Sequence, residues 1–225
     1  EDAAQGVMAK YQDKYLGTIG DIGCYSFHET KNYQMGEGGA IVLNNQKYID
    51  RAEILREKGT NRSRFFRGQV DKYSWIDIGS SYLPSEINAA VLWSQLDKAE
   101  LINNNRIETW NYYYNKLQEI KELELPVVPE DCVHNGHLFY VKVKDLKTRT
   151  QVLKQLKENG VSAVFHYVPL HSSEAGMKYG MFHGKDVYTT KESERLLRLP
   201  LYYDMKEIDR MKVVDELIRI MKDNQ

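Results

Sequence analysis

Lys31 is the residue whose type and setting most strongly suggest chemistry. The run Ser26-Phe27-His28-Glu29-Thr30-Lys31 is followed by Gly36-Glu37-Gly38-Gly39. This order places the lysine at the end of a predicted strand and before a turn whose glycines permit close backbone approach. Taken alone, Lys31 would be a solvated surface lysine, because lysine is rarely buried without a partner. Asp2 lies upstream, at the end of a matching predicted strand. A carboxylate and a lysine that both follow strands favour a functional site over a solvated surface lysine.

Three histidines raise the alternative of a metal or acid–base cluster. His28, His166 and His171 lack the spacing of such a cluster, since no Asp or Glu joins two of them on one helical face. We therefore expect structural roles or positions at the edge of a substrate, with His28 the best candidate for substrate contact because it lies three residues from Lys31. Cys24 and Cys132 are far apart and form no CxxC pattern, so we predict packing residues and no metal site.

The composition limits the possible partners. The 225 residues include 31 Lys and Arg against 32 Asp and Glu, a net charge of -1. No polycationic field for nucleic acid or anionic lipid exists, so any phosphate binding must be local. Mean hydropathy is -0.59, and no apolar run approaches the roughly 18 residues of a membrane span. With no signal-peptide pattern at the start, we predict a soluble cytoplasmic protein that binds neither nucleic acid nor membranes.

The elements that must position Lys31 and Asp2 come early in the chain. β-rich runs flanked by glycine predict strands at residues 22–27 and 39–43, with a loop between them. An amphipathic pattern predicts a helix at residues 46–58, ending at Gly59. Residues 60–83 are predicted to be irregular. From Pro84, apolar residues keep helical spacing to Leu117, with a break expected near residues 103–105.

Strands and helices alternate in the last part of the chain. We predict strands at residues 123–128, 138–143 and 161–166, and helices at residues 148–158, 191–197 and 206–222. This alternation is typical of an α/β unit. The predicted domains are therefore residues 1–119, including the long helix, and residues 120–225. The start at Glu1 without an initiator Met suggests a truncated polypeptide.

Four motifs together resemble a known family. They are E-D-A-A-Q from Glu1, S-F-x-x-x-K-x-x-x-x-G-E-G-G from Ser26, G-x-x-Y-x-x-S-E-x-x-A-A from Gly79 and F-H-Y-x-P-L-H from Phe165. In this combination the chain resembles the DegT/DnrJ/EryC/StrS sugar aminotransferases, which use pyridoxal 5'-phosphate (PLP). The resemblance implies the α/β PLP-dependent transferase fold type I of aspartate aminotransferase. Residues 1–119 would be the C-terminal part of an incomplete large domain, and residues 120–225 the small domain.

The resemblance also assigns cofactor-binding residues. Lys31 matches the lysine that binds PLP covalently as an imine and then acts as a base. Asp2 matches the carboxylate facing the pyridine nitrogen, where an opposite charge raises the pKa of the ring; otherwise it is a capping residue. Gln5 is expected against the ring, or else is a polar strand-end residue, and Ser26 is expected to hydrogen-bond the phosphate. Ser81 replaces the family asparagine that reaches the phosphate in the neighbouring subunit, and otherwise belongs to a turn before a helix.

A basic, aromatic segment has two competing interpretations. Arg62, Arg64, Arg67 and Lys72 alternate with Phe65, Phe66 and Tyr73 in the sequence. Such a run is commonly a solvated loop. The resemblance implies a nucleotide-sugar substrate, whose diphosphate and flat base are groups that guanidinium forks and aromatic rings bind.

Three longer runs of the sequence extend the resemblance to family members with a particular substrate. The runs C-Y-S-F-H-E-T-K-N-Y, E-K-G-T-N-R-S-R-F-F-R-G-Q-V-D-K-Y and D-I-G-S-S-Y-L-P-S-E are similar to members that aminate carbon 4 of dTDP-4-oxo-6-deoxy-D-glucose. We therefore expect amino transfer from glutamate, giving dTDP-4-amino-4,6-dideoxygalactose for a surface glycan such as lipopolysaccharide. A homodimer with shared active sites is also implied.

Three alternatives to this activity stay open. One is amination of another nucleotide-linked keto sugar, at carbon 3 or on a UDP carrier. Another is a non-catalytic fragment of such an enzyme. The third is the dehydration carried out by relatives with histidine in place of the lysine, which the presence of Lys31 disfavours.

Overall fold

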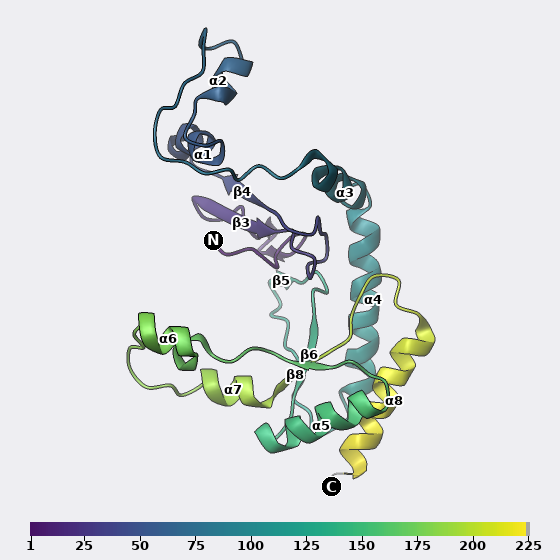
Figure 1. Ribbon diagram of the computed structural model, residues 1–225. Coiled ribbons are helices and arrows are strands. Elements are labelled where there is room, and N and C mark those ends of the chain that lie inside the picture. Colours follow the sequence, from purple (N-terminus) through teal and green to yellow (C-terminus); the bar gives the residue numbers. More distant parts are fainter. Residues whose placement is uncertain (224–225) are drawn as a thin grey trace. The chain divides into compact units, whose positions relative to one another are not determined.

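The computed structural model describes residues 1–223, which form two compact units (Figure 1). The first unit contains residues 1–103 and 129–135, and the second contains residues 104–128 and the chain from residue 136 onward. The division falls inside helix α4 (Ala99–Leu117). The predicted domain boundary after residue 119 lies just beyond this helix and stays a prediction. Among residues 1–223, no helix is long and apolar enough to cross a membrane.

An antiparallel pair of strands, β3 (Ile22–Ser26) and β4 (Gly39–Leu43), lies at the centre of the first unit. Ile22 pairs with Leu43 at one end and Ser26 pairs with Gly39 at the other. These strands confirm the predictions for residues 22–27 and 39–43. A second small sheet has the order β2-β1-β5, from strands of two residues each: β1 (Lys10–Tyr11), β2 (Lys14–Tyr15) and β5 (Cys132–Val133).

Helices follow β4 in the chain. The 3-10 turn η1 (Gln46–Tyr48) and α1 (Ile49–Arg56) confirm the helix predicted for residues 46–58. The prediction that residues 60–83 are irregular is wrong for α2 (Arg62–Phe66). Helix α3 (Glu86–Leu96) begins after Ser85, whose side chain accepts a hydrogen bond from the backbone of Asn88.

The predicted helix break near residues 103–105 is wrong. The chain turns at Asp97 and Lys98 instead, where the backbone N–H of Lys98 bonds to the carbonyl of Gln95. Helix α4 then continues through the asparagines, because Asn103 is buried within it and the side chain of Asn105 accepts a hydrogen bond from the backbone of Asp204 at 2.8 Å.

The second unit is built on a sheet of order β6-β8-β7, with antiparallel neighbours. Its strands are β6 (Phe139–Lys142), β7 (Val164–Phe165) and β8 (Leu196–Leu199). Its other elements are α5 (Leu146–Glu158), η2 (Leu170–Ser172), α6 (Glu174–Tyr179), α7 (Thr189–Arg195) and α8 (Glu207–Asp223).

Most of the predictions for this unit are confirmed, and two are wrong. The strands predicted at 138–143 and 161–166 and the helices at 148–158 and 206–222 are present. Residues 123–128 form only one isolated bridge, between Glu124 and Lys142. The helix predicted at 191–197 ends at Arg195, because Leu197 and Leu199 belong to β8 and are buried in the core.

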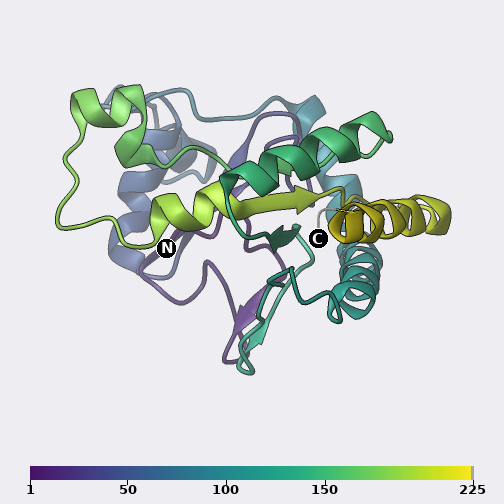
Figure 2. The same ribbon diagram turned by 90° about the horizontal axis from the view of Figure 1, so that it is seen from below.

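One face of this sheet is covered and the other is open. Phe139, Val141, Leu197 and Leu199 are buried in a core shared with α4, α5 and α8. Figure 2 shows α5 lying along β8. The residues that alternate with them in β6 and β8, including Arg198, are only partly buried, so the opposite face is free for polar groups.

Candidate active site

Asp2 lies beside β3. It forms a parallel bridge with Cys24, and the neighbouring Ala3 N–H donates to the Cys24 carbonyl at 3.0 Å. The Asp2 carboxylate accepts a hydrogen bond from the Ala4 N–H at 3.1 Å and is exposed. The chain therefore places this carboxylate where a short extended segment next to β3 ends.

Ser26 occupies the last position of β3. Its Oγ accepts a hydrogen bond from the His28 N–H at 3.3 Å. Within residues 1–223 its own O–H donates to no protein group, so the hydroxyl proton is free for a ligand oxygen.

The loop that carries Lys31 is firmly held. Phe27 donates to the Gly38 carbonyl at 2.8 Å, and the Lys31 N–H donates to the His28 carbonyl at 2.9 Å. Two residues beyond Lys31, the buried Tyr33 donates its hydroxyl to the Ala99 carbonyl at 3.0 Å. Gly38 has no room for a side chain, because a Cβ there would lie 2.4 Å from Met35 Sδ. The backbone at Lys31 is thus fixed by buried neighbours.

The side chain of Lys31 is half-buried and unpaired. In the part of the chain that the structure describes, its ammonium makes no hydrogen bond or ion pair. A lysine on a rigid loop with an uncommitted amine suits imine formation, since the amine need not leave a partner first. The donor set of Lys31, Ser26 and Asp2 therefore fits PLP in its chemistry: an amine, a phosphate donor and a carboxylate for the ring nitrogen.

His28 is held by its own loop. Its Nδ1 accepts a hydrogen bond from the Thr30 N–H at 3.2 Å, and its Nε2 lies 3.6 Å from Glu37 Oε1. Because Nδ1 accepts, the neutral ring carries its proton on Nε2. Residues 1–223 contain no group of three or more His, Cys, Asp or Glu side chains placed to hold a metal ion.

Asn135 is a site residue that the sequence analysis missed. This buried side chain donates through Nδ2 to the carbonyls of Gln5 and Val7, at 2.7 and 2.8 Å. Asn32, next to Lys31, donates through its own Nδ2 to the Asn135 carbonyl at 2.9 Å. Asn135 thereby ties the segment after Asp2 to the lysine loop. No sequence signal marked it, because its partners lie more than 100 residues away.

The predicted substrate arginines form a second group, on α2 and directly after it, where each is already paired. Arg62 binds the buried Glu57 at 3.0 Å, and Arg64 binds Asp50 at 2.6 Å. Arg67 binds Glu53 with both terminal nitrogens, at 2.8 and 2.7 Å.

These pairs change how the arginines could bind a substrate. The hydrogen bond from Arg67 lowers the pKa of Glu53 and keeps it ionised. To bind a diphosphate, the guanidinium groups would have to exchange these carboxylates for phosphate. Ser81 lies near this group, since it forms a backbone bridge with Glu57, and its side chain is exposed.

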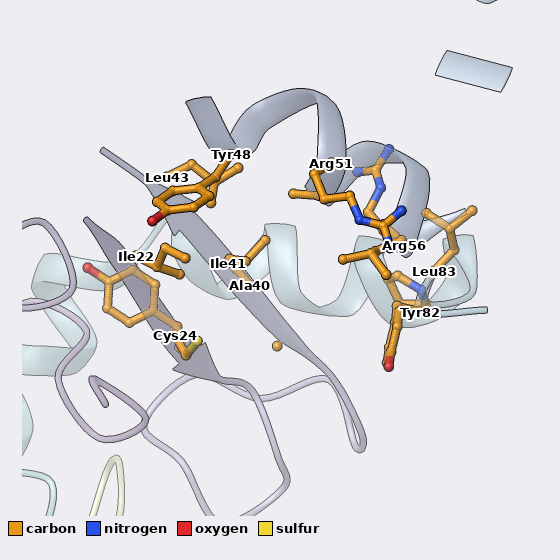
Figure 3. Close-up of a pocket in the computed structure, with 15 residues that line it drawn as sticks. Ile22, Cys24, Ala40, Ile41, Leu43, Tyr48, Arg51, Arg56, Tyr82 and Leu83 are labelled. Atoms are coloured by element: carbon orange, nitrogen blue, oxygen red, sulfur yellow. The ribbon is translucent and has the colours of Figure 1, made fainter. Parts of the chain in front are cut away.

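A cavity of about 800 Å³ is present whose lining includes no residue of the segment 26–38 that carries Lys31 (Figure 3). It is lined by one face of β3 and β4, by α1 and by residues 82–84. Ile22, Ile41 and Leu43 make it largely apolar, and Arg51 and Arg56 border it. None of the predicted cofactor-binding residues lines this cavity, so size alone does not identify the site.

Solved structures share this fold. The aminotransferase TlmJ from Streptoalloteichus hindustanus is 23% identical with a TM-score of 0.86, covering 100% of this chain and 58% of its own. PseC from Helicobacter pylori, an aminotransferase involved in the biosynthesis of pseudoaminic acid, is 20% identical with a TM-score of 0.86, covering 99% and 59%. The putative sugar aminotransferase Spr1654 from Streptococcus pneumoniae, in its PMP-form, is 20% identical with a TM-score of 0.83, covering 100% and 59%. The chain thus has the PLP-dependent transferase fold type I, as predicted.

The family follows from the sequence match. Residues 1–218 match the model of the DegT/DnrJ/EryC1/StrS aminotransferase family, and the chain belongs to this family. Its members are PLP enzymes, which confirms the predicted cofactor at the level of the family.

Two curated relatives are similar to the whole chain. The uncharacterised protein MJ1066 of Methanocaldococcus jannaschii is 31% identical over 237 residues, covering 100% of this chain and 60% of the relative. The spore coat polysaccharide biosynthesis protein SpsC of Bacillus subtilis is 28% identical over 235 residues, covering 99% and 58%. The chain therefore spans about 60% of the length of the relatives that it matches.

Proposed function

We propose that the protein transfers an amino group, with PLP as cofactor, from glutamate to a nucleotide-linked keto sugar. The single observation that supports this most strongly is the uncommitted ammonium of Lys31 on a loop fixed by buried neighbours. A structural lysine would be expected to pair with a carboxylate, and a surface lysine would not need a rigid loop.

Each candidate residue has a role in this proposal. Lys31 binds the cofactor through its Nζ, and after release the same amine moves a proton on the substrate. Asp2 keeps the cofactor ring nitrogen protonated, and the free O–H of Ser26 donates to the phosphate. Gln5, whose backbone Asn135 holds, lies against the ring. PLP supplies an electron sink for the amino-transfer chemistry when bound.

The proposed substrate is dTDP-4-oxo-6-deoxy-D-glucose, aminated at carbon 4 to give dTDP-4-amino-4,6-dideoxygalactose for surface glycan synthesis. The support is the similarity of three long runs around Lys31, the arginine segment and Ser81 to enzymes with this substrate. His28 borders the sugar, and Arg62, Arg64 and Arg67 bind the diphosphate after exchanging their carboxylates. Ser81 contributes to the cofactor site of a partner in a cytoplasmic homodimer.

Borohydride trapping tests the proposal. The intact protein is incubated with PLP, reduced with borohydride and digested. The mass of each lysine-containing peptide is then measured by mass spectrometry. We expect a cofactor-sized mass on the Lys31 peptide and none on the peptides of Lys14 and Lys58. The label on Lys14 or Lys58 alone would refute the assignment. As a second readout, Lys31→Ala should abolish amino transfer from glutamate while leaving PLP binding measurable.

A further inference from the structure

The side chain of Glu1 is bound by a turn of the main chain. Its Oε1 accepts a hydrogen bond from the Gly17 N–H at 2.6 Å. Its Oε2 accepts two more, from the N–H groups of Ile19 and Gly20, both at 3.1 Å. Backbone N–H groups that converge in this way form a concave site for an anion. Glu1 is the first residue of the E-D-A-A-Q motif, and the function proposed above gives it no role.

The turn that binds Glu1 has a fixed shape. Gly17 has a φ of 86°, and a Cβ at this position would lie 2.7 Å from the ring of Tyr25 in β3. The Tyr25 hydroxyl donates to the carbonyl of Leu16, just before the turn. A Cβ at Gly23 would overlap the Gly17 carbonyl oxygen, so β3 packs directly against the turn. The N–H groups of the turn are therefore held in place independently of Glu1.

The same hydrogen bonds determine the charge of Glu1. The bond from the Gly17 N–H, which outweighs the opposing effect of burial, lowers the pKa of Glu1, and the bonds from Gly20 and Ile19 lower it further. The carboxylate is therefore ionised at neutral pH. Hydrogen bonds from N–H groups to an ionised carboxylate are stronger than those between neutral groups, so the turn holds Glu1 firmly.

The backbone on either side of Asp2 pairs with β3. The Cys24 N–H donates to the Glu1 carbonyl at 3.0 Å, and the Ala3 N–H donates to the Cys24 carbonyl at 3.0 Å. Asp2 and Cys24 thus form an isolated parallel bridge and not a long ladder. This bridge fixes where Asp2 lies along β3. The side chain of Glu1 adds a second attachment, to the turn of residues 17–20, and two attachments together fix how the segment is oriented.

We propose that Glu1 is the positioning residue for Asp2: by binding the turn of residues 17–20, it holds the Asp2 carboxylate in the orientation that the cofactor ring nitrogen requires. The inference rests on the proposed function, in which Asp2 keeps that nitrogen protonated. Glu1 acts through the backbone that it shares with Asp2 and does not touch the cofactor. When Glu1 is lost, the Asp2 carboxylate moves away from the ring nitrogen, and a more distant charge holds the proton less tightly.

The proton affinity of the ring nitrogen tests this role. The intact protein is loaded with PLP that is isotopically labelled at the ring nitrogen, and the NMR signal of this nitrogen is followed as the pH rises. In Glu1→Gln, the pH at which the nitrogen loses its proton should fall by about one unit, a tenfold loss of proton affinity. Equal titration in Glu1→Gln and the wild type, or no titration in either, would overturn the proposal.

Glu130→Gln is the matched control. Glu130 is an exposed acid of the same unit, and its side chain makes no hydrogen bond or ion pair within residues 1–223. Its loss should change the proton affinity of the ring nitrogen less than about twofold. Equal falls in Glu130→Gln and Glu1→Gln would show an effect of net charge and overturn the positioning role.

Glu1→Asp separates position from charge at the same residue. Aspartate keeps the negative charge but is one methylene shorter, so it cannot span the three N–H groups of the turn. We expect Glu1→Asp to lower the pH of deprotonation as Glu1→Gln does. A wild-type value in Glu1→Asp would show that the charge of Glu1 acts from a distance, and would overturn the proposal.

Hydrogen exchange measures the attachment itself without the cofactor. The amides of residues 17–20 should exchange about tenfold faster in Glu1→Gln than in the wild type or Glu130→Gln, because they lose their acceptor. Unchanged exchange would overturn the proposal. If Glu1→Gln fails to fold, Glu1→Asp serves for both measurements. Absence of trapped PLP on Lys31 of the wild type would refute the proposed function and this inference with it. Trapped PLP with an unchanged ring-nitrogen titration in Glu1→Gln would overturn this inference alone.

Discussion

Asn135 holds Gln5 from a distance of 130 residues in the chain: its Nδ2 donates to the Gln5 carbonyl at 2.7 Å. The same nitrogen donates to the Val7 carbonyl, and the Asn135 carbonyl accepts from Asn32 beside Lys31. One buried residue therefore connects the two segments that carry the candidate carboxylate and the candidate lysine, through its side-chain amide on one side and its backbone carbonyl on the other. It is a positioning residue, since it touches backbone and not the proposed reacting groups.

Asn135→Ala tests this role. The change leaves two carbonyl groups without their donor and should lower the free energy of unfolding by roughly 1–3 kcal/mol. Urea unfolding followed by circular dichroism measures it. Asn111→Ala on the exposed side of α4 is the control and should leave stability unchanged or slightly raised, because alanine is the better helix former. Equal stability of Asn135→Ala and the wild type would contradict the positioning role.

Arg62→Ala separates the structural from the ligand-binding role of the arginine segment. Glu57 is 7% exposed, so loss of its partner leaves a buried carboxylate unpaired. Because Arg62 is itself partly exposed, we expect a loss of roughly 1–3 kcal/mol in the free energy of unfolding. Glu57→Gln in the same chain should recover part of it, and a double-mutant cycle measures the coupling. A cycle with no coupling energy would show that this pair does not stabilise the fold.

Arg67→Ala examines substrate binding at the same segment. If Arg67 exchanges Glu53 for a diphosphate, the variant should raise the KM for the nucleotide sugar by about tenfold, the effect of one charge-assisted contact. The glutamate half-reaction, measured by the change in cofactor absorbance in the intact protein, should be unaffected. Equal losses in both half-reactions would indicate a folding defect instead.

How much of the fold can be predicted from the sequence depends on how far apart in the chain the interacting residues lie. Residues 22–27 and 39–43 were predictable because runs of β-forming residues stand between glycines. The two-residue strands β1, β2 and β5 were not, since two residues show no alternation. The sequence pattern predicts that the helix before Leu196 continues into Leu196–Leu199. In the structure these residues form β8 instead, because Leu197 and Leu199 are buried in the core of the second unit.

The candidate site shows the same limit. The family motifs identify Lys31, Asp2 and Ser26, and the structure places all three at or near β3. The sequence could not show that Arg64 and Arg67 pair with acids 14 residues earlier, because that depends on how α2 folds back toward α1. Asn135 was missed for the same reason: its importance lies in what surrounds it in space.

Acidification should destabilise the fold through His166. Its folded pKa lies below the ordinary value of 6.5, so the unfolded chain takes up the proton first as the pH falls. The stability that this group contributes is present above pH 6.5 and decreases as the pH falls toward the lowered pKa. Urea unfolding at pH 7.5 and 5.5 should show lower stability at pH 5.5, and His166→Gln should reduce the difference. His134, whose pKa burial also lowers, accounts for a further part. An unchanged difference in His166→Gln would contradict the assignment.

Tyr167 has a φ of 46°, in the left-handed region that bulky residues rarely adopt. Tyr167→Gly should therefore remove strain at little cost in stability. A non-glycine residue in the left-handed region costs about 1–2 kcal/mol, which glycine avoids. Glycine also gains about 0.5–1 kcal/mol of freedom in the unfolded chain, so the two effects nearly cancel. We therefore expect a free energy of unfolding within about 1 kcal/mol of the wild type, measured in urea. Val168→Gly, at an exposed neighbour without positive φ, gains the same freedom and relieves no strain, so it should be the less stable variant. If Tyr167→Gly is instead the less stable of the two, the Tyr167 ring contributes more to packing than its 65% exposure indicates, and its conformation is not a site of stored strain.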